Sequence, residues 1–141
     1  MEKLKKKILV TGVFDLLHQE HINFLNKAKQ EGEVLVVGVE SDVRVKELKG
    51  SGRPVNNQRQ RLKEIKRLGL ADQAFILPEK FISDTDHLRL LNSIKPDVLA
   101  VSSHTPHLDK KRQLMKQIGG EVKVVYDQNP AVSTTTLLAE K

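Results

Sequence analysis

Two histidines, His18 and His21, stand three residues apart at the beginning of a segment whose apolar side chains recur at helical spacing. Residues three apart on a helix lie on the same face, so both imidazoles can point at one spot. The first turn of a helix also offers N–H groups and the positive end of the helix dipole, which attract anions. This combination suits phosphoryl or nucleotidyl transfer, in which catalysis consists mostly of positioning and charge stabilisation.

On spacing alone, the same two histidines also fit a surface or helix-capping role. They fit a metal site less well, because no carboxylate or third histidine follows at a fixed spacing that would complete a ligand set. No residue is therefore assigned as a metal ligand. The choice between the other interpretations depends on where the fold places the pair.

The pattern of the whole chain predicts an α/β domain. Short β-branched runs alternate with longer amphipathic segments, an order typical of βαβ crossovers in a parallel sheet. The strands are predicted at 7–11, 34–39, 73–77, 97–101 and 122–126, and the helices at 19–31, 41–48, 58–68, 85–94, 109–118 and from 133 onward. We therefore expect residues 1–141 to form a single doubly wound, Rossmann-like domain with a five-stranded parallel sheet.

The segment that carries the histidines comes directly after the first predicted strand. In doubly wound sheets, ligands bind beyond the carboxyl ends of the strands, at the switch point beside the first strand. Gly12 is expected to let the backbone turn tightly there, and Gly32 is expected to end the following helix. This placement supports the catalytic interpretation of the histidine pair and leaves the capping interpretation open.

Composition excludes several classes of protein. The chain has 141 residues and no cysteine, which excludes disulfides, thiolate zinc sites and a cysteine nucleophile. Its longest apolar runs are about six residues, far below the roughly 20 that a membrane helix needs. Nothing at the N-terminus resembles a secretory signal. We therefore expect a cytoplasmic protein that does not contact a membrane.

The net charge of +6 favours polyanions or phosphorylated small molecules as partners. Nucleic acid is the weaker candidate, because one Tyr, four Phe and no Trp leave few side chains that could stack on bases. The basic residues of the predicted helix 58–68 fit the solvent-facing side of an amphipathic helix instead. These residues are Arg59, Arg61, Lys63, Lys66 and Arg67. We expect no nucleic-acid partner.

Several segments resemble one family, and they follow its order along nearly the whole chain. Residues 12–21 resemble the G-x-F-D-x-x-H-x-G-H motif of the cytidylyltransferase-like nucleotidyltransferases. Residues 48–56 are similar to the K-G-x-x-R-P-x-N loop of bacterial heptose-phosphate adenylyltransferases, and residues 132–135 to the family's I-S-T-T segment. Arg61 and Leu62 resemble the start of the helix after that loop. Glycerol-phosphate cytidylyltransferases are the next most similar group.

The resemblance implies transfer of AMP or CMP from a nucleoside triphosphate (ATP or CTP) to a small phosphorylated sugar or alditol. Family members use Mg²⁺, release pyrophosphate and form no covalent enzyme intermediate. They are often dimers, so the resemblance also implies a homodimer. A non-catalytic nucleotide-binding or regulatory module is the alternative function.

The resemblance also assigns residues by position. The catalytic set that it implies is His18, His21, Lys46 and Lys49. The nucleotide-binding set that it implies is Thr11, Gly12, Val13, Phe14, Asp15, Arg61, Ser133, Thr134 and Thr135. The histidines would bind the triphosphate, one of the two lysines would reach its phosphates from the loop after the second strand, and the last three residues would hold the β- and γ-phosphates.

Four positions depart from the family pattern. Glu20 replaces the glycine between the two histidines, and Gly69 and Gln128 stand where the family has arginines. Residues 101–105 replace a glycine-aspartate segment that helps recognise the base in the family. The sequence therefore does not indicate which nucleotide base is recognised. The added glutamate and the two missing arginines all lower the positive potential around a triphosphate. These changes are the reason for keeping a non-catalytic module as the alternative.

Overall fold

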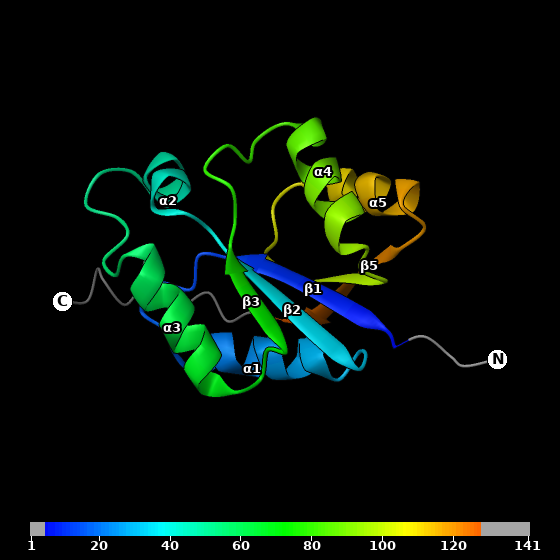
Figure 1. Ribbon diagram of the computed structural model, residues 1–141, viewed down its shortest axis with the longest axis horizontal. Helices are drawn as coiled ribbons and strands as arrows, with labels where there is room; N and C mark the ends of the chain where they lie inside the picture. The colour runs from blue at the N-terminus through cyan, green and yellow to red at the C-terminus, as the bar shows by residue number, and fades with distance from the viewer. Residues whose placement is uncertain (1–4, 128–141) are drawn as a thin grey trace.

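The computed structural model describes residues 5–127, which alternate strands and helices along the chain (Figure 1). In order, the elements are β1 (Lys7–Gly12), α1 (Gln19–Lys29), β2 (Val34–Val39), α2 (Asp42–Lys49), α3 (Gln58–Leu68), β3 (Gln73–Ile76), α4 (Asp84–Ile94), β4 (Val98–Ser102), α5 (Leu108–Gln117) and β5 (Glu121–Tyr126). This order confirms the predicted succession within the described part of the chain. The helix predicted from residue 133 lies outside it.

The five strands form one sheet in the order β3-β2-β1-β4-β5, and every neighbouring pair is parallel. The chain winds outward from β1 to β3 and then returns across β1 to place β4 on its other side. The switch point therefore lies between β1 and β4, where a doubly wound sheet offers its ligand crevice. The Rossmann-like α/β fold is confirmed.

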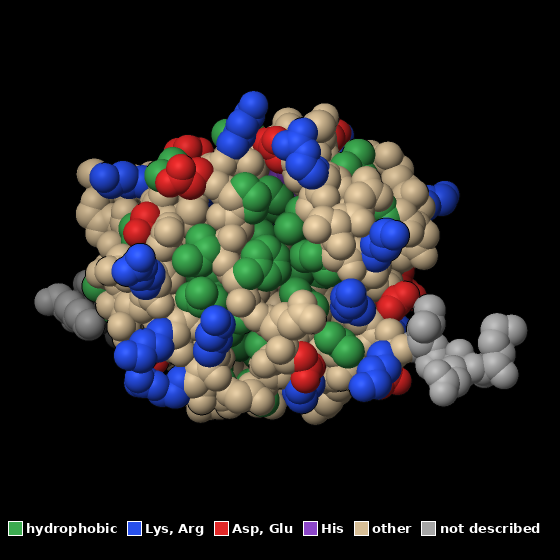
Figure 2. Space-filling model, in the orientation of Figure 1, with side chains coloured by type: hydrophobic (Ala, Val, Ile, Leu, Met, Phe, Trp, Pro, Cys, Tyr) green, Lys and Arg blue, Asp and Glu red, His purple; other side chains and the backbone are tan. Residues whose placement is uncertain are grey.

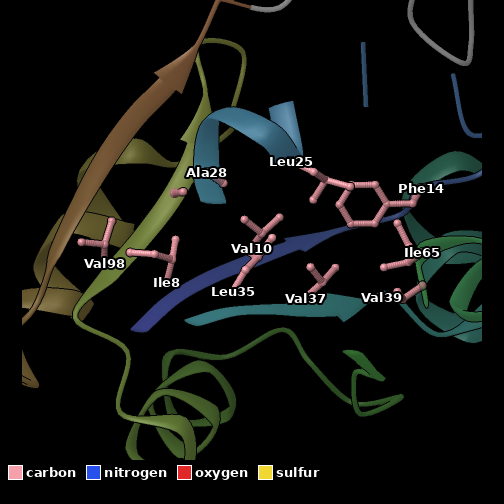
Figure 3. Packing of buried hydrophobic residues seen from close by; sticks show 11 residues of the cluster. Ile8, Val10, Phe14, Leu25, Ala28, Leu35, Val37, Val39, Ile65 and Val98 are labelled. Atoms are coloured by element: carbon pink, nitrogen blue, oxygen red, sulfur yellow. The ribbon is translucent and has the colours of Figure 1, made fainter. Parts of the chain in front are cut away.

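Each face of the sheet has its own core, because successive side chains of a strand point to opposite faces. Buried strand residues on the side of α1 and α3 are Ile8, Val10, Leu35, Val37, Val39, Val98 and Ala100 (Figure 3). Strand residues on the side of α4 and α5 are Leu9, Val36, Leu99 and Val101. The near-continuous apolar runs of β1, β2 and β4 thus reflect strands that are covered on both faces. Helices α1 and α5 approach the switch point from opposite faces (Figure 1).

Most element bounds agree with the prediction to within one or two residues, and those of α3 agree completely. The prediction for the end of α1 is wrong: the helix ends at Lys29 with Gln30 as its C-cap, and Gly32 follows in the turn. Gly32 has a steric role instead, because a Cβ at this position would lie 2.7 Å from the Lys6 carbonyl oxygen. Gly32 therefore allows the entry to β2 to pack against the start of β1.

Within residues 5–127, no helix combines the length and apolarity needed to cross a bilayer. All the described strands belong to one sheet. That the whole of residues 1–141 forms one domain stays a prediction.

Candidate functional site

The turn after β1 brings the functional residues to the crevice. Phe14 and Leu16 adopt positive φ angles of 51° and 54°, which non-glycine residues rarely do. Gly12 is the last residue of β1 and has no positive φ, so it does not contribute to the turn through a left-handed backbone. Its role is close packing, because a Cβ at Gly12 would lie 2.9 Å from the ring of Phe14. The buried Phe14 ring thus fixes the path of the chain from β1 into α1.

His18 and His21 cap the N-terminus of α1 reciprocally. The Nδ1 atom of His18 accepts a hydrogen bond from the Glu20 backbone N–H at 3.2 Å. The Nδ1 atom of His21 accepts one from the His18 backbone N–H at 3.2 Å. The two rings stack with their centroids 3.9 Å apart and an interplanar angle of 27°. The two imidazoles lie together at the start of α1, and the capping interpretation is confirmed.

These bonds fix which nitrogen of each ring carries the proton. Because both Nδ1 atoms accept hydrogen bonds, a neutral imidazole must carry its proton on Nε2. The Nε2 atom of His18 is buried and has no partner among residues 5–127. Both rings therefore hold an N–H donor that the cap does not use.

The environment favours the neutral form of both histidines. Burial lowers the pKa of His21 to about 4, and the charges of His18 and Lys49 add to the effect while Asp15 opposes it. Burial also lowers the pKa of His18, against an opposing effect of Glu20. Near neutral pH, the pair therefore acts as two neutral hydrogen-bond donors and not as two cations.

A cavity of about 360 Å³ opens at the carboxyl ends of the strands, at the switch point. Of the residues that the resemblance singled out, those that line it are Thr11, Gly12, Val13, Phe14, His21 and Lys49. The nearby His18 stacks on His21. Lys46 instead lines a separate open depression beside Gly52 and Pro54. Of the two candidate lysines, Lys49 is thus the one at the cavity.

Asp15 holds the loop that follows α2. Its carboxylate is 1% exposed and accepts hydrogen bonds from the backbone N–H groups of Val55 at 2.6 Å and Asn56 at 2.9 Å. The Nε atom of Arg53 lies 3.7 Å from the same carboxylate. Asp15 therefore positions residues 53–56, and it does not line the cavity as a nucleotide-binding residue would.

Arg61 requires a correction on two points. It is 0% exposed, so the expectation that it lies on the solvent-facing side of its helix is wrong. Its guanidinium donates to the carbonyl oxygens of Asn56, Val13 and Glu40, and to the Asp42 carboxylate at 2.7 Å. Arg61 does not line the cavity. Its hydrogen bonds connect the loop before α3, the ends of β1 and β2, and the start of α2. Ser133, Thr134 and Thr135 lie outside the described residues.

Glu20, which replaces the family's glycine, lines the cavity. Its carboxylate accepts a hydrogen bond from the hydroxyl of Tyr126 at the end of β5, and the Asn23 amide donates to the same hydroxyl at 3.4 Å. Glu20 therefore points toward β5, along the wall of the cavity. Gly69 is the left-handed C-cap of α3 (φ 73°), a conformation that disfavours the arginine of the family.

Sequence reasoning missed two charged residues of the cavity, Glu40 and Lys111. Glu40 follows β2 directly, and Lys111 comes from α5 and donates a hydrogen bond to the Thr105 hydroxyl. Burial raises the pKa of Glu40 and lowers that of Lys111. The position of Glu40 at the carboxyl end of a parallel strand was a usable signal, whereas that of Lys111 depends on how α5 packs.

The described residues do not gather three or more histidines and carboxylates that could hold a metal ion. Glu20 and Glu40 are acidic side chains that line the cavity, and each could supply one oxygen ligand to a cation brought in by a phosphorylated substrate.

The parallel sheet, the crevice at its switch point and the capped helix beside it define a Rossmann-like domain of the nucleotidyltransferase class. The chain belongs to the cytidylyltransferase-like family, whose model matches residues 9–140.

Individual relatives support this assignment. The chain is 46% identical over 99 residues to the bifunctional protein HldE of Campylobacter concisus, an alignment that covers 70% of this chain and 20% of that protein. It is 36% identical over 139 residues to HldE of Pseudomonas paraeruginosa, covering 97% of this chain and 28% of that protein. The chain thus spans between a fifth and just over a quarter of these curated relatives.

A solved structure is similar over most of both chains. The lipopolysaccharide core biosynthesis protein from Thermoplasma volcanium superposes with a TM-score of 0.71 at 25% identity. The match covers 89% of this chain and 98% of that one. A domain of this length therefore occurs in a relative as nearly the whole of the crystallised chain.

Proposed function

We propose that this protein transfers a nucleotidyl group, AMP or CMP, from a nucleoside triphosphate to a small phosphorylated sugar or alditol and releases pyrophosphate. The observation that carries the proposal is the pair of capping histidines at the switch-point cavity, with His21 and Lys49 on its wall. Membership of the cytidylyltransferase-like family supports the reaction class. The resemblance of residues 48–56 to the loop of bacterial heptose-phosphate adenylyltransferases favours a heptose phosphate as acceptor and ATP as donor.

The geometry suits charge stabilisation without a covalent intermediate. The Nε2–H groups of His18 and His21 are donors that stay available after both Nδ1 atoms have been used by the cap. They can bind the phosphate oxygens on which negative charge increases as pyrophosphate departs. Lys49 adds a positive charge close to His21, as its effect on the pKa of that ring indicates. The resemblance assigns Ser133, Thr134 and Thr135, which lie outside the described residues, to the same triphosphate site.

Magnesium is proposed to arrive with the triphosphate, where it neutralises phosphate charge. Mg²⁺ is usually bound through substrate phosphates and one or two carboxylates. Glu20 fits the second requirement, because its carboxylate lines the cavity at the first turn of α1. We further propose a cytoplasmic homodimer that does not bind nucleic acid; one residue of the basic helix, Arg61, is buried and committed to internal bonds.

The decisive test is pyrophosphate release by the purified protein, measured for each pairing of ATP and CTP with heptose phosphates and glycerol 3-phosphate. Release above background with at least one pair is expected. A non-catalytic module would instead be stabilised by nucleotide, by about 2.7 kcal/mol at a hundredfold excess over Kd, without turnover. If nucleotide stabilises the protein but no pair of substrates releases pyrophosphate, the protein is a non-catalytic module and the proposed transferase function is wrong.

Variants that keep the helix cap separate the chemistry from folding. Asn is a good N-cap residue and Gln is the usual residue at the third helical position of a capping box. His18→Asn and His21→Gln should therefore keep the helix start while losing the imidazole donors. We expect each to lower kcat by about 10²- to 10³-fold. The control is Asn26→Ala on the exposed side of α1, which should leave kcat unchanged.

A further inference from the structure

Polar and ionisable side chains line the cavity from both faces of the sheet, with His21 coming from α1 on one face and Lys111 from α5 on the other. His21, at the start of α1 on the side of Ile8 and Val10, forms one group with Lys49, at the end of α2. Glu40 and Lys111 form the other, and each influences the other's pKa. The function proposed above uses only the first group, which leaves the second to be explained.

Strand alternation places Glu40 on the side of α4 and α5. Val37 and Val39 face the α1 and α3 core, whereas Val36 faces the opposite core. Continuing the alternation, Glu40 faces the same side as Val36. Lys111 approaches from that side as well, since α5 packs on the core that contains Leu114 and Met115.

Both side chains retain unused hydrogen-bonding capacity beside the cavity. The Oε2 atom of Glu40 is buried and has no partner within residues 5–127. A buried carboxylate oxygen without a partner is costly, so such an atom fits a ligand that donates to it. The ammonium of Lys111 has three N–H donors, and the structure gives it one hydrogen-bond partner in the described chain, the Thr105 hydroxyl.

Backbone contacts hold Glu40 in place. Its N–H donates to the Gly12 carbonyl oxygen at 2.9 Å, and its carbonyl oxygen accepts from the buried guanidinium of Arg61 at 2.7 Å. The carboxylate is therefore carried on a rigid backbone next to Thr11 and Gly12. A rigid mounting of this kind is what a recognition site needs.

The geometry of nucleotidyl transfer requires two anion sites on opposite sides of the α-phosphate. The attacking and leaving oxygens lie roughly in line with the phosphorus. If pyrophosphate departs toward His18, His21 and Lys49, the acceptor must enter from the other side. Glu40 and Lys111 line the cavity from the side of α4 and α5, opposite the side from which α1 brings His21.

We propose that Glu40 and Lys111 form the acceptor-binding pair of the cavity, and this inference rests on the proposed function. Lys111 binds the phosphate of the acceptor, and Glu40 accepts a hydrogen bond from a hydroxyl group of the same molecule. In the reaction, an oxygen of this phosphate forms a bond to the α-phosphorus. The bond from that phosphorus to the bridging oxygen breaks, and the electron pair leaves with pyrophosphate. The acceptor class is therefore a phosphate ester that also carries hydroxyl groups.

The test compares KM values for the two substrates in single variants. Lys111→Gln should raise KM for the phosphorylated acceptor by about 10- to 100-fold, as expected for the loss of one charged hydrogen bond. KM for the nucleoside triphosphate should stay within about twofold. Lys116→Gln, an exposed position on the same helix, is the matched control and should change neither value. Lys111→Arg keeps the charge and should restore most of the acceptor affinity.

A second measurement uses binding alone. Calorimetry with glycerol 3-phosphate and heptose phosphates, in the presence of a non-hydrolysable triphosphate analogue, should detect the acceptor in the wild type and weaker binding in Lys111→Gln. Glu40→Met should weaken binding of these hydroxylated acceptors more than binding of inorganic phosphate, whereas Lys111→Gln should weaken both.

The possible outcomes distinguish failure of this inference from failure of the proposed function on which it rests. In one outcome, the wild type releases pyrophosphate but Lys111→Gln raises KM for the triphosphate instead of the acceptor. Glu40 and Lys111 then belong to the nucleotide site, so the inference is wrong, but the proposed function is not affected. Unchanged KM values in a folded Lys111→Gln variant overturn the inference as well. If the wild type releases no pyrophosphate with any pair, both the proposed function and the proposed acceptor site are wrong.

Discussion

At the level of single residues, the histidine pair combines two roles that are usually considered separately. The Nδ1 atoms cap α1, so each neutral ring carries its proton on Nε2. That N–H group can donate a hydrogen bond to a phosphate oxygen. The spacing of His18 and His21 was enough to predict that the rings meet. It could not predict their protonation state, because that depends on burial and on the positive charge of Lys49.

The depressed pKa of His21 predicts how stability depends on pH. The folded-state value of about 4 lies below the value of about 6.5 in the unfolded chain, so the unfolded state binds the extra proton between these limits. Stability should therefore fall as the pH drops from 6.5 toward 4, by about 3 kcal/mol at most from this residue. Urea unfolding measured across that pH range should show that the free energy of unfolding decreases less for His21→Gln than for the wild type. Parallel pH profiles would contradict the burial of a neutral ring.

At the level of elements, Arg61 explains how the site is held together. It belongs to α3, yet it bonds to the turn after β1, the end of β2, the start of α2 and the loop before its own helix. Sequence analysis gave the bounds of α3 correctly, since amphipathic periodicity is local. It did not predict the internal bonds of Arg61 and Asp15, because most of their partners lie about 20 to 48 residues away and only the fold brings them near.

Replacing Arg61 should therefore destabilise the whole site. Arg61→Lys keeps the charge but cannot form the forked contacts, so buried carbonyl groups and the Asp42 carboxylate lose their donor. We expect a loss of about 3 to 5 kcal/mol in the free energy of unfolding. Chemical denaturation measures it directly. Arg59→Lys, at an exposed position on the same helix, should change stability by less than about 0.5 kcal/mol.

At the level of the whole molecule, one face of the sheet is incompletely covered. Figure 2 shows hydrophobic side chains gathered in the middle of the molecule, in the area between α2 and α4 in Figure 1. Phe75 on β3 and Leu88 on α4 are partly buried residues of this side. Contiguous apolar surface ringed by charged residues is typical of an interaction site. We propose that a second copy of the chain covers it, which would give the homodimer that the resemblance implies.

The dimer can be tested without disturbing the core. Ile82, which lies in the connection from β3 to α4, is 65% exposed. Ile82→Lys should shift the protein from a mass near twice 15.9 kDa toward the monomer in light scattering after gel filtration. Val124→Lys, at a 46% exposed position on the opposite edge strand, is the control and should leave the mass unchanged. A wild type that remains monomeric at high concentration would contradict the proposal.

The shared use of the two imidazoles has an evolutionary consequence. Since α1 begins with them, selection for a folded domain alone would act against replacing them by residues that cannot cap, because losing an N-cap typically costs about 1 kcal/mol. A descendant that had ceased to turn over substrate would still be under this selection. The presence of the pair in any homologue is therefore poor evidence of surviving activity, and kinetic measurement has to replace inspection of the motif.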